Sequence, residues 1–123
     1  YQPAERVPEV LATADMHVVA LRRGLAASSV PSKMYSILAA GRPLIASVDE
    51  GSEVARVVGE AGAGVAVPPE DAEAFIAAVE RLAADAEERW SMGASGRAWA
   101  EQWASPRSVA EAHMQLMGEL LSR

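Results

Sequence analysis

Short apolar runs alternate with helix-periodic segments along the first 70 residues of the chain. Apolar positions spaced three and four residues apart predict helices over residues 4–14, 31–40 and 51–61. Three runs rich in small and branched apolar residues predict buried strands over residues 16–21, 43–47 and 62–67. This alternation is typical of a parallel sheet covered by helices on both faces. We therefore expect an α/β fold, a three-layer Rossmann-like parallel sheet, with strand centres at Val18, Leu44–Ile45 and Val65.

The rest of the chain, residues 70–123, has only helical periodicity. Residues 70–85 predict an amphipathic helix whose apolar face comprises Phe75, Ile76, Val79 and Leu82. Residues 86–103 predict a further helix or helix pair with three tryptophans that we assign to core and interdomain packing: Trp90, Trp99 and Trp103. A serine followed by a proline is typical of a helix start, so a last helix is expected from Ser105-Pro106.

A length of 123 residues corresponds to one domain, but three strands are few for a doubly wound sheet. The chain also begins with Tyr1 rather than Met. We therefore expect a single truncated domain over residues 1–123, with further strands upstream and a helical C-terminal part over residues 70–123.

Charge and composition exclude several classes of function. The net charge of −6 excludes the basic surface that general nucleic-acid binding requires, so no nucleic-acid partner is expected. There is no cysteine, and the two histidines, His17 and His113, are far apart in the sequence. Thiolate metal sites are therefore excluded, and no metal site of another kind is expected.

Lys33, the single lysine of the chain, lies in the first turn of the predicted helix over residues 31–40. This helix follows the first strand and a loop, and ligands of open parallel sheets bind beyond the carboxyl ends of the strands. A helix start offers free N–H groups and a partial positive charge, to which Ser32 adds a hydroxyl. A lysine there opposes the helix dipole, and a bound diphosphate would offset that repulsion. A solvated surface lysine and a plain serine cap are the alternatives.

Three carboxylates follow the second strand: Asp49, Glu50 and Glu53. A carboxylate pair can serve as general acid and base. We favour the simpler interpretation, an acidic first turn of a helix that Ser52 caps.

The stretch "VPSKMYSILAAGRPLIAS", with the helix and strand that follow it, resembles the C-terminal domain of family 4 glycosyltransferases, which have the GT-B fold. Its "PSK" and "LAAGRPLIA" segments are similar to a bacterial fucosaminyl-type subgroup of surface polysaccharide synthesis. "LATADMHVVAL" and "RWSMGASGRAWAEQWAS" are similar to the family's "ADV" strand and its M-G-x-x-G-R segment. The resemblance covers nearly the whole chain.

The resemblance implies transfer of a sugar, with retention, from a UDP or GDP sugar to a glycan or lipid-linked acceptor. In the family, the C-terminal domain binds the donor, while an N-terminal domain, expected upstream of this chain, holds the acceptor and supplies an Arg/Lys pair. No catalytic residue is then expected within this chain, and no cofactor or metal besides the donor substrate. The intact enzyme is expected in the cytoplasm, with peripheral association at the inner face of the membrane.

The residues implied to contact the donor lie in two segments. Ser29, Ser32, Lys33 and Ser36 surround the helix start, and Gly51 and Ser52 follow the second strand. The family often carries two glutamates eight positions apart, which fall here on Ser28 and Ser36. The second glutamate binds the ribose hydroxyls, and Ser36 is a weaker acceptor at that position.

Two other functions remain as alternatives from sequence. One is a non-catalytic, flavodoxin-like binding or regulatory module. The other is a GT-B sugar-nucleotide epimerase, which requires acid and base side chains in the cleft.

Overall fold

A computed structural model describes residues 2–26 and 28–122 of the chain. Within them, three strands form a parallel sheet in the order β1 (His17–Ala20), β2 (Leu44–Ser47) and β3 (Gly64–Val67). Val18 pairs with Ile45, and Ile45 pairs with Val65, so the predicted strand centres lie side by side. The predicted parallel α/β sheet is confirmed.

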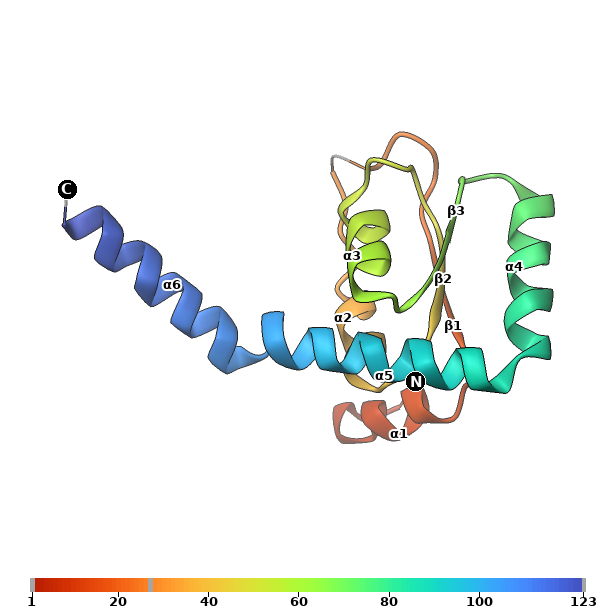
Figure 1. Cartoon of the computed structure of the whole chain (residues 1–123), viewed down its shortest axis with the longest axis horizontal. Coiled ribbons are helices and arrows are strands. Elements are labelled where there is room, and N and C mark those ends of the chain that lie inside the picture. The colour runs from red at the N-terminus through yellow and green to blue at the C-terminus, as the bar shows by residue number, and fades with distance from the viewer. Residues whose placement is uncertain (1, 27, 123) are drawn as a thin grey trace.

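The helices form two layers and a base around this sheet (Figure 1). α2 (Lys33–Ala39) and α3 (Glu53–Ala61) cover one face, and α4 (Ala72–Ala84) covers the other. α5 (Ala86–Trp103) crosses beneath the amino edge of the sheet. α1 (Val7–Ala12) and the short 3-10 turn η1 (Ala4–Arg6) lie at the same edge, where α1 contacts α2. α6 (Pro106–Leu121) extends away from these layers.

Each face of the sheet has its own buried cluster, because successive strand side chains point to opposite faces. Leu44 and Ala46 pack with Met34 and Leu38 of α2 and with the valines of α3. Ile45 packs on the other face with Ala78 and Leu82 of α4. Each fully buried aliphatic side chain contributes about 1.5–3 kcal/mol to folding.

Two glycines allow α5 to approach the domain closely. A Cβ atom on Gly93 would lie 2.2 Å from the carbonyl oxygen of Gly41, in the turn between α2 and β2. A Cβ atom on Gly96 would lie 2.9 Å from side-chain atoms of both Leu38 and Ala63. The "MGASGR" segment singled out in the sequence therefore has a packing role, since it brings α5 against the amino edge.

Some predicted details are wrong. α2 begins at Lys33 rather than Pro31. Of the two arrangements expected for residues 86–103, a single helix is the one observed. Ile76 is 55% exposed, because α4 packs on the sheet through Ala78 and Leu82, with partly buried Phe75 and Val79 beside them.

The tryptophans differ from one another. Trp99 packs on the core and stacks on Tyr35, with 6.4 Å between ring centroids. Trp90 and Trp103 are 79% and 61% exposed, so they do not belong to the core of this domain, and their assignment to interdomain packing stays a prediction. They lie toward the two ends of α5, beyond the buried middle at Gly93 and Gly96.

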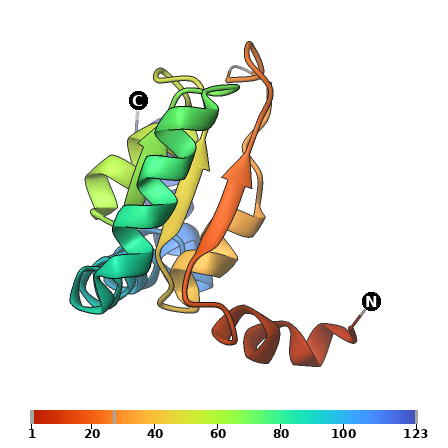
Figure 2. The ribbon, with the colours of Figure 1, turned by 90° about the vertical axis from the view of Figure 1, so that its right-hand side faces the viewer.

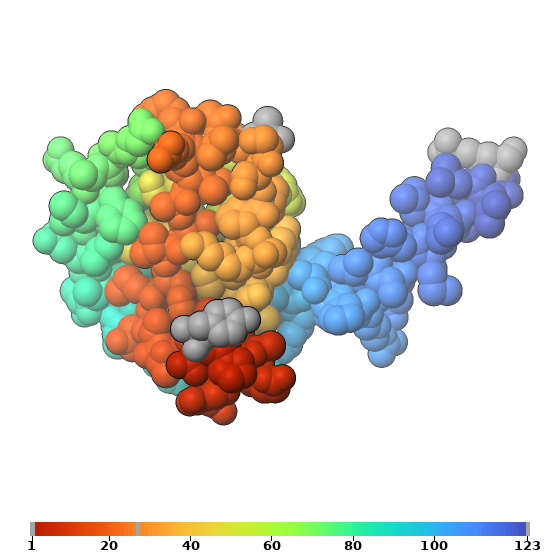
Figure 3. Space-filling view, turned by 180° about the vertical axis from the view of Figure 1, so that it is seen from behind, coloured from red at the N-terminus to blue at the C-terminus, as the bar shows by residue number. Residues whose placement is uncertain are grey.

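α6 has no buried residue and stands apart from the other elements, as the space-filling view shows (Figure 3). Its start matches the prediction, because Ser105 accepts a hydrogen bond from the N–H of Ser108. Its exposed apolar side chains include Met114, Leu116, Met117, Leu120 and Leu121. Among the helices described, none is long and apolar enough to cross a membrane.

Candidate functional site

The loops that follow the three strands meet at the carboxyl edge of the sheet (Figure 2, top). A cavity of about 840 Å³ opens there between the loops after β2 and β3 and the first turns of α3. Arg23, from the loop after β1, completes its lining. In open parallel sheets, this edge is where ligands bind.

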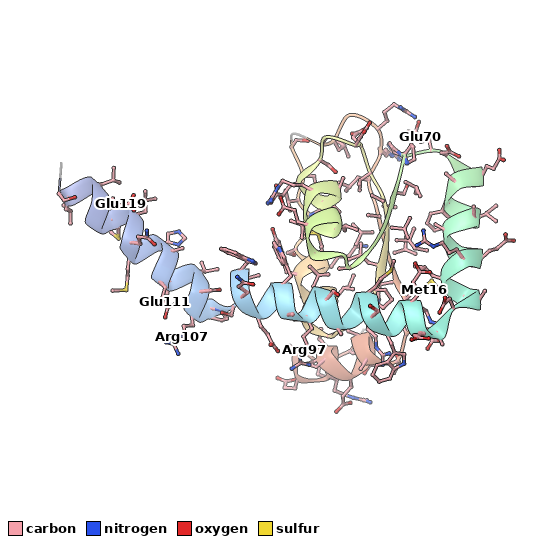
Figure 4. All side chains as sticks on the ribbon, in the orientation of Figure 1. Met16, Glu70, Arg97, Arg107, Glu111 and Glu119 are labelled. Atoms are coloured by element: carbon pink, nitrogen blue, oxygen red, sulfur yellow. The ribbon has the colours of Figure 1, made fainter. Side chains whose placement is uncertain are left out.

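Arg23 and Gly24 connect the three loops. The N–H of Gly24 donates to Oδ2 of Asp49 at 2.8 Å. The Arg23 guanidinium donates to the carbonyl oxygen of Pro69 at 3.0 Å and lies 3.6 Å from the carboxylate of Glu70. Figure 4 shows Glu70 at this edge, above the strands. Asp49 is therefore held in a loop-to-loop contact.

The start of α3 forms one wall of the cavity. Ser52 caps the helix as predicted: its hydroxyl oxygen accepts from the N–H of Ala55 at 3.1 Å, and the residue is 2% exposed. In the described part of the chain, the N–H groups of Glu53 and Val54 donate no hydrogen bond. This helix end therefore offers two free donors and the positive end of the helix dipole.

Glu53 belongs to an ion-pair network on α3. Arg56 lies 2.5 Å from carboxylate oxygens of both Glu53 and Glu60. The hydrogen bond from Arg56 lowers the pKa of Glu53, and its two carboxylate partners raise the pKa of Arg56. Glu53 is thus ionised at neutral pH and serves as the acidic first turn predicted for this helix, which removes it as a proton donor.

Lys33 opens α2 and is exposed. Within residues 2–26 and 28–122, it makes no ion pair or side-chain hydrogen bond. Ser32 occupies the N-cap position, but its hydroxyl accepts no cap hydrogen bond, so the plain-cap alternative is not observed. The last turn of α2 meets α5 at the amino edge, so Lys33 marks the end that points toward the carboxyl edge.

The predicted contact residues border two different spaces. Gly51 and Ser52 line the cavity at the carboxyl edge. Ser32 lines a second cavity, of about 870 Å³, between α2, α3 and the junction of α5 with α6. Arg56 borders both cavities. The linings of these two cavities do not include Ser29, Lys33 or Ser36.

Besides Arg56, the sequence analysis missed Arg23 as a charged residue of the cavity lining. No spacing rule distinguishes it from its neighbour Arg22, which is exposed and makes no polar side-chain contact with the described residues. The role of Arg23 depends on contacts with Pro69 and Glu70, more than forty positions away, and no local signal predicts such contacts.

The histidines lie outside these cavities. His17 is half-buried, with its Nε2 2.9 Å from the carbonyl oxygen of Leu11, as expected for a core or edge histidine. His113 is exposed on α6, with its Nδ1 2.8 Å from the carbonyl oxygen of Val109. The described residues contain no group of three or more His, Cys, Asp or Glu placed to hold a metal ion.

A sequence profile of the family described as "Glycosyl transferases group 1" matches residues 1–85. The chain belongs to this family. A "Probable glycosyltransferase WbjE" from Pseudomonas aeruginosa is 35% identical over 72 residues, which cover 58% of this chain and 18% of the relative. The chain thus spans less than a fifth of the length of that relative. No solved structure matches this chain.

The part of this group 1 glycosyl transferase that matches the family contains the cavity at the carboxyl edge. Residues 1–85 include the whole sheet, the three loops beyond it and α4. α5 and α6 lie beyond the matched residues. The family assignment therefore rests on the part of the fold that builds the candidate site.

Proposed function

We propose that the chain is the donor-binding half of a retaining glycosyltransferase of family 4, with the GT-B fold. The donor is a UDP or GDP sugar, and the acceptor is a glycan or a lipid-linked glycan. The relation to a fucosaminyl-type subgroup and a role in cytoplasmic polysaccharide synthesis at the inner membrane face belong to the same proposal. Membership of the group 1 family supports glycosyl transfer over a non-catalytic module.

The observation that carries the proposal is the cavity at the carboxyl edge of a parallel sheet. Its volume, about 840 Å³, lies within the roughly 300–1,000 Å³ of small-molecule sites. The free N–H groups at the start of α3 suit a phosphate group on one side. Lys33 and the N–H groups of Ser32 and Lys33, which donate no hydrogen bond to described residues, are further donors at the start of α2, outside the lining of this cavity.

The charges near the cavity are largely engaged within the chain. Arg56 is paired with two glutamates, and Arg23 lies against Glu70. A diphosphate therefore needs further positive charge, and Lys33 is a cation that no described residue neutralises. We infer that Lys33 and an upstream Arg/Lys pair share the diphosphate, as the resemblance implies.

The chemistry assigned to this chain is stabilisation of the leaving group. During transfer, the bond between the sugar's anomeric carbon and the β-phosphate oxygen breaks, and a bond to an acceptor hydroxyl oxygen forms. Negative charge grows on the leaving nucleoside diphosphate, and fixed N–H groups and an ammonium near it lower the barrier. No acid–base pair is assigned here, because Glu53 is held ionised by Arg56 and Asp49 accepts from Gly24.

An upstream half is part of the proposal. Val18, on the edge strand β1, is 43% exposed, although parallel sheets are normally covered on both faces. The apolar residues of α6 are likewise exposed, while its polar residues bond to one another, as in Arg107–Glu111 and Gln115–Glu119. We expect the upstream half to cover these two surfaces.

Binding of nucleoside diphosphates to Lys33 variants tests the proposal. A hydrogen bond to a charged group contributes about 1.5–3 kcal/mol, and about 1.4 kcal/mol is a factor of ten. Lys33→Ala is therefore expected to weaken UDP or GDP binding about tenfold to a hundredfold. Lys33→Arg should restore part of the affinity, because it keeps the charge with a different geometry. The affinities are measured by isothermal titration calorimetry.

Arg22→Ala is the matched control, since Arg22 is an exposed cation of the neighbouring loop. UMP is the ligand control, because it lacks the second phosphate. Equal UDP affinity in the wild type, Lys33→Ala and Arg22→Ala would assign Lys33 to the solvated surface. Absence of binding to UDP, GDP and their sugars would contradict the donor-site assignment itself.

A further inference from the structure

The loop between β1 and α2 has few ties to the rest of the domain. After Leu21, which continues the sheet ladder through Ser47, the described loop residues bond mainly among themselves. Leu25 accepts from the N–H groups of both Ser28 and Ser29. The larger apolar residues of the loop, Leu25 and Val30, are 39% and 45% exposed. A segment with so little burial opens at low free energy unless specific contacts hold it.

Two adjacent residues provide those contacts among the described positions. Gly24 donates its backbone N–H to Asp49 at 2.8 Å, and Arg23 reaches Pro69 and Glu70. Gly24 has a φ of +84°, a conformation that glycine adopts without the cost of a Cβ atom. The turn is thus shaped so that the N–H of Gly24 points at the loop after β2.

The two contacts differ in strength. The Arg23–Glu70 pair is 3.6 Å long, and both side chains are more than 60% exposed, so it contributes little. The Gly24–Asp49 bond is 2.8 Å long, and its acceptor is a carboxylate oxygen. Asp49 is also half-buried and belongs to the cavity lining. Arg23 also donates to the carbonyl oxygen of Pro69 at 3.0 Å. Asp49 and Arg23 therefore share the hold on the loop, and the Asp49 carboxylate is the acceptor that a substitution in the loop after β2 removes.

We propose that Asp49 is a positioning residue of the donor site: its carboxylate fixes the loop after β1, and with it Ser29, Ser32 and Lys33. This inference rests on the proposed function, because it assigns Asp49 a role in presenting those residues to a nucleoside diphosphate. It also explains why a carboxylate stands beside a site for an anion. Asp49 faces an N–H group of the loop, and this donor offsets part of its repulsion of an anion.

The first arm of the test measures the loop without any ligand. Trypsin cleaves after arginine, and Arg22 and Arg23 place two cleavage sites at the tethered turn. Asp49→Ala is expected to raise the rate of cleavage there about fivefold, the effect of losing one modest hydrogen bond. Asp49→Asn keeps an acceptor oxygen and should stay near the wild-type rate. Cleavage after Arg107 in α6, followed in the same digest, gives the internal reference.

Glu50→Ala is the control for charge. Glu50 is adjacent, exposed and also lines the cavity, but no described residue donates a hydrogen bond to its side chain. Its removal should leave the rate of cleavage in the loop unchanged. Equal rates in the wild type and Asp49→Ala would overturn the proposal. So would equal acceleration in Asp49→Ala, Asp49→Asn and Glu50→Ala, since charge alone would then explain it.

The second arm measures binding of UDP and GDP by calorimetry. Asp49→Ala is expected to bind about fivefold more weakly, because part of the binding free energy must then be used to order the loop. Asp49→Asn should recover most of the affinity. Faster cleavage with unchanged affinity would overturn the positioning role. A wild-type chain that binds neither nucleotide would contradict the proposed function, while the cleavage rates would still decide whether Asp49 holds the loop.

Discussion

Gly93→Ala perturbs the point where α5 meets the turn before β2. The added Cβ atom would lie 2.2 Å from the oxygen and 3.0 Å from the carbon of the Gly41 carbonyl group. Both are backbone atoms that cannot rotate away, so α5 must shift. Overpacking of this kind lowers the free energy of unfolding by roughly 1–3 kcal/mol. This is the net loss that remains after the gain of about 1 kcal/mol from replacing a helical glycine with alanine. At roughly 3–5 °C for each kcal/mol, we expect the melting temperature to fall by about 3–15 °C.

Gly59→Ala makes the same change within α3, where a Cβ atom would meet nothing within 4 Å. It should therefore leave stability unchanged or raise it by up to about 1 kcal/mol. Thermal and urea unfolding followed by circular dichroism measure both variants. If Gly93→Ala proves as stable as Gly59→Ala, the close approach of α5 to Gly41 does not exist as described.

Two further predictions concern activity and pH. The chain alone should not turn over any UDP or GDP sugar, because the proposal places the acceptor site and a basic pair upstream; sugar release above background in a coupled assay would contradict this. Glu53 has a lowered pKa in the folded state, so the stability it adds is present above about pH 4.3 and is lost as the pH falls through the folded pKa. Its side chain is 39% exposed, so Glu53→Gln should cost about 0.5 kcal/mol or less at pH 7 and less still at pH 3. A loss that grows toward low pH would refute the assignment.

The sheet could be predicted from sequence because its signals are local. Short apolar runs set the strands, and the register of Val18, Ile45 and Val65 follows from pairing like segments in a parallel sheet. The helix caps at Ser52 and Ser105 could likewise be predicted from the sequence, since each serine directly precedes its helix. The sequence did not predict which side chains of α5 are buried, because their burial depends on where that helix crosses the domain. Trp90 and Trp103 carry the large apolar side chains expected of core residues, but they lie outside the core of this domain.

The candidate site was predictable only in its position. A parallel sheet places its ligands at the carboxyl edge, and a cavity lies there with Gly51 and Ser52 in its wall. The contacts of Gly24 with Asp49 and of Arg23 with Pro69 join residues 25 and 46 positions apart. Such contacts form only when the loops after the three strands come together in the fold, so no local sequence pattern predicts them. The donor-contact roles of all six residues stay predictions: Ser29, Ser32, Lys33, Ser36, Gly51 and Ser52.

The most direct test of the central claim is an NMR titration of the isotopically labelled chain with UDP and with GDP. If the diphosphate binds at the carboxyl edge, backbone amide signals should shift at residues 29–30, 32–34 and 51–54, at the starts of α2 and α3. Signals of the amino edge, such as Asp15, Arg42 and Trp90, should stay in place. Shifts confined to the amino edge, or no shift at millimolar nucleotide, would contradict the claim that this edge holds the donor.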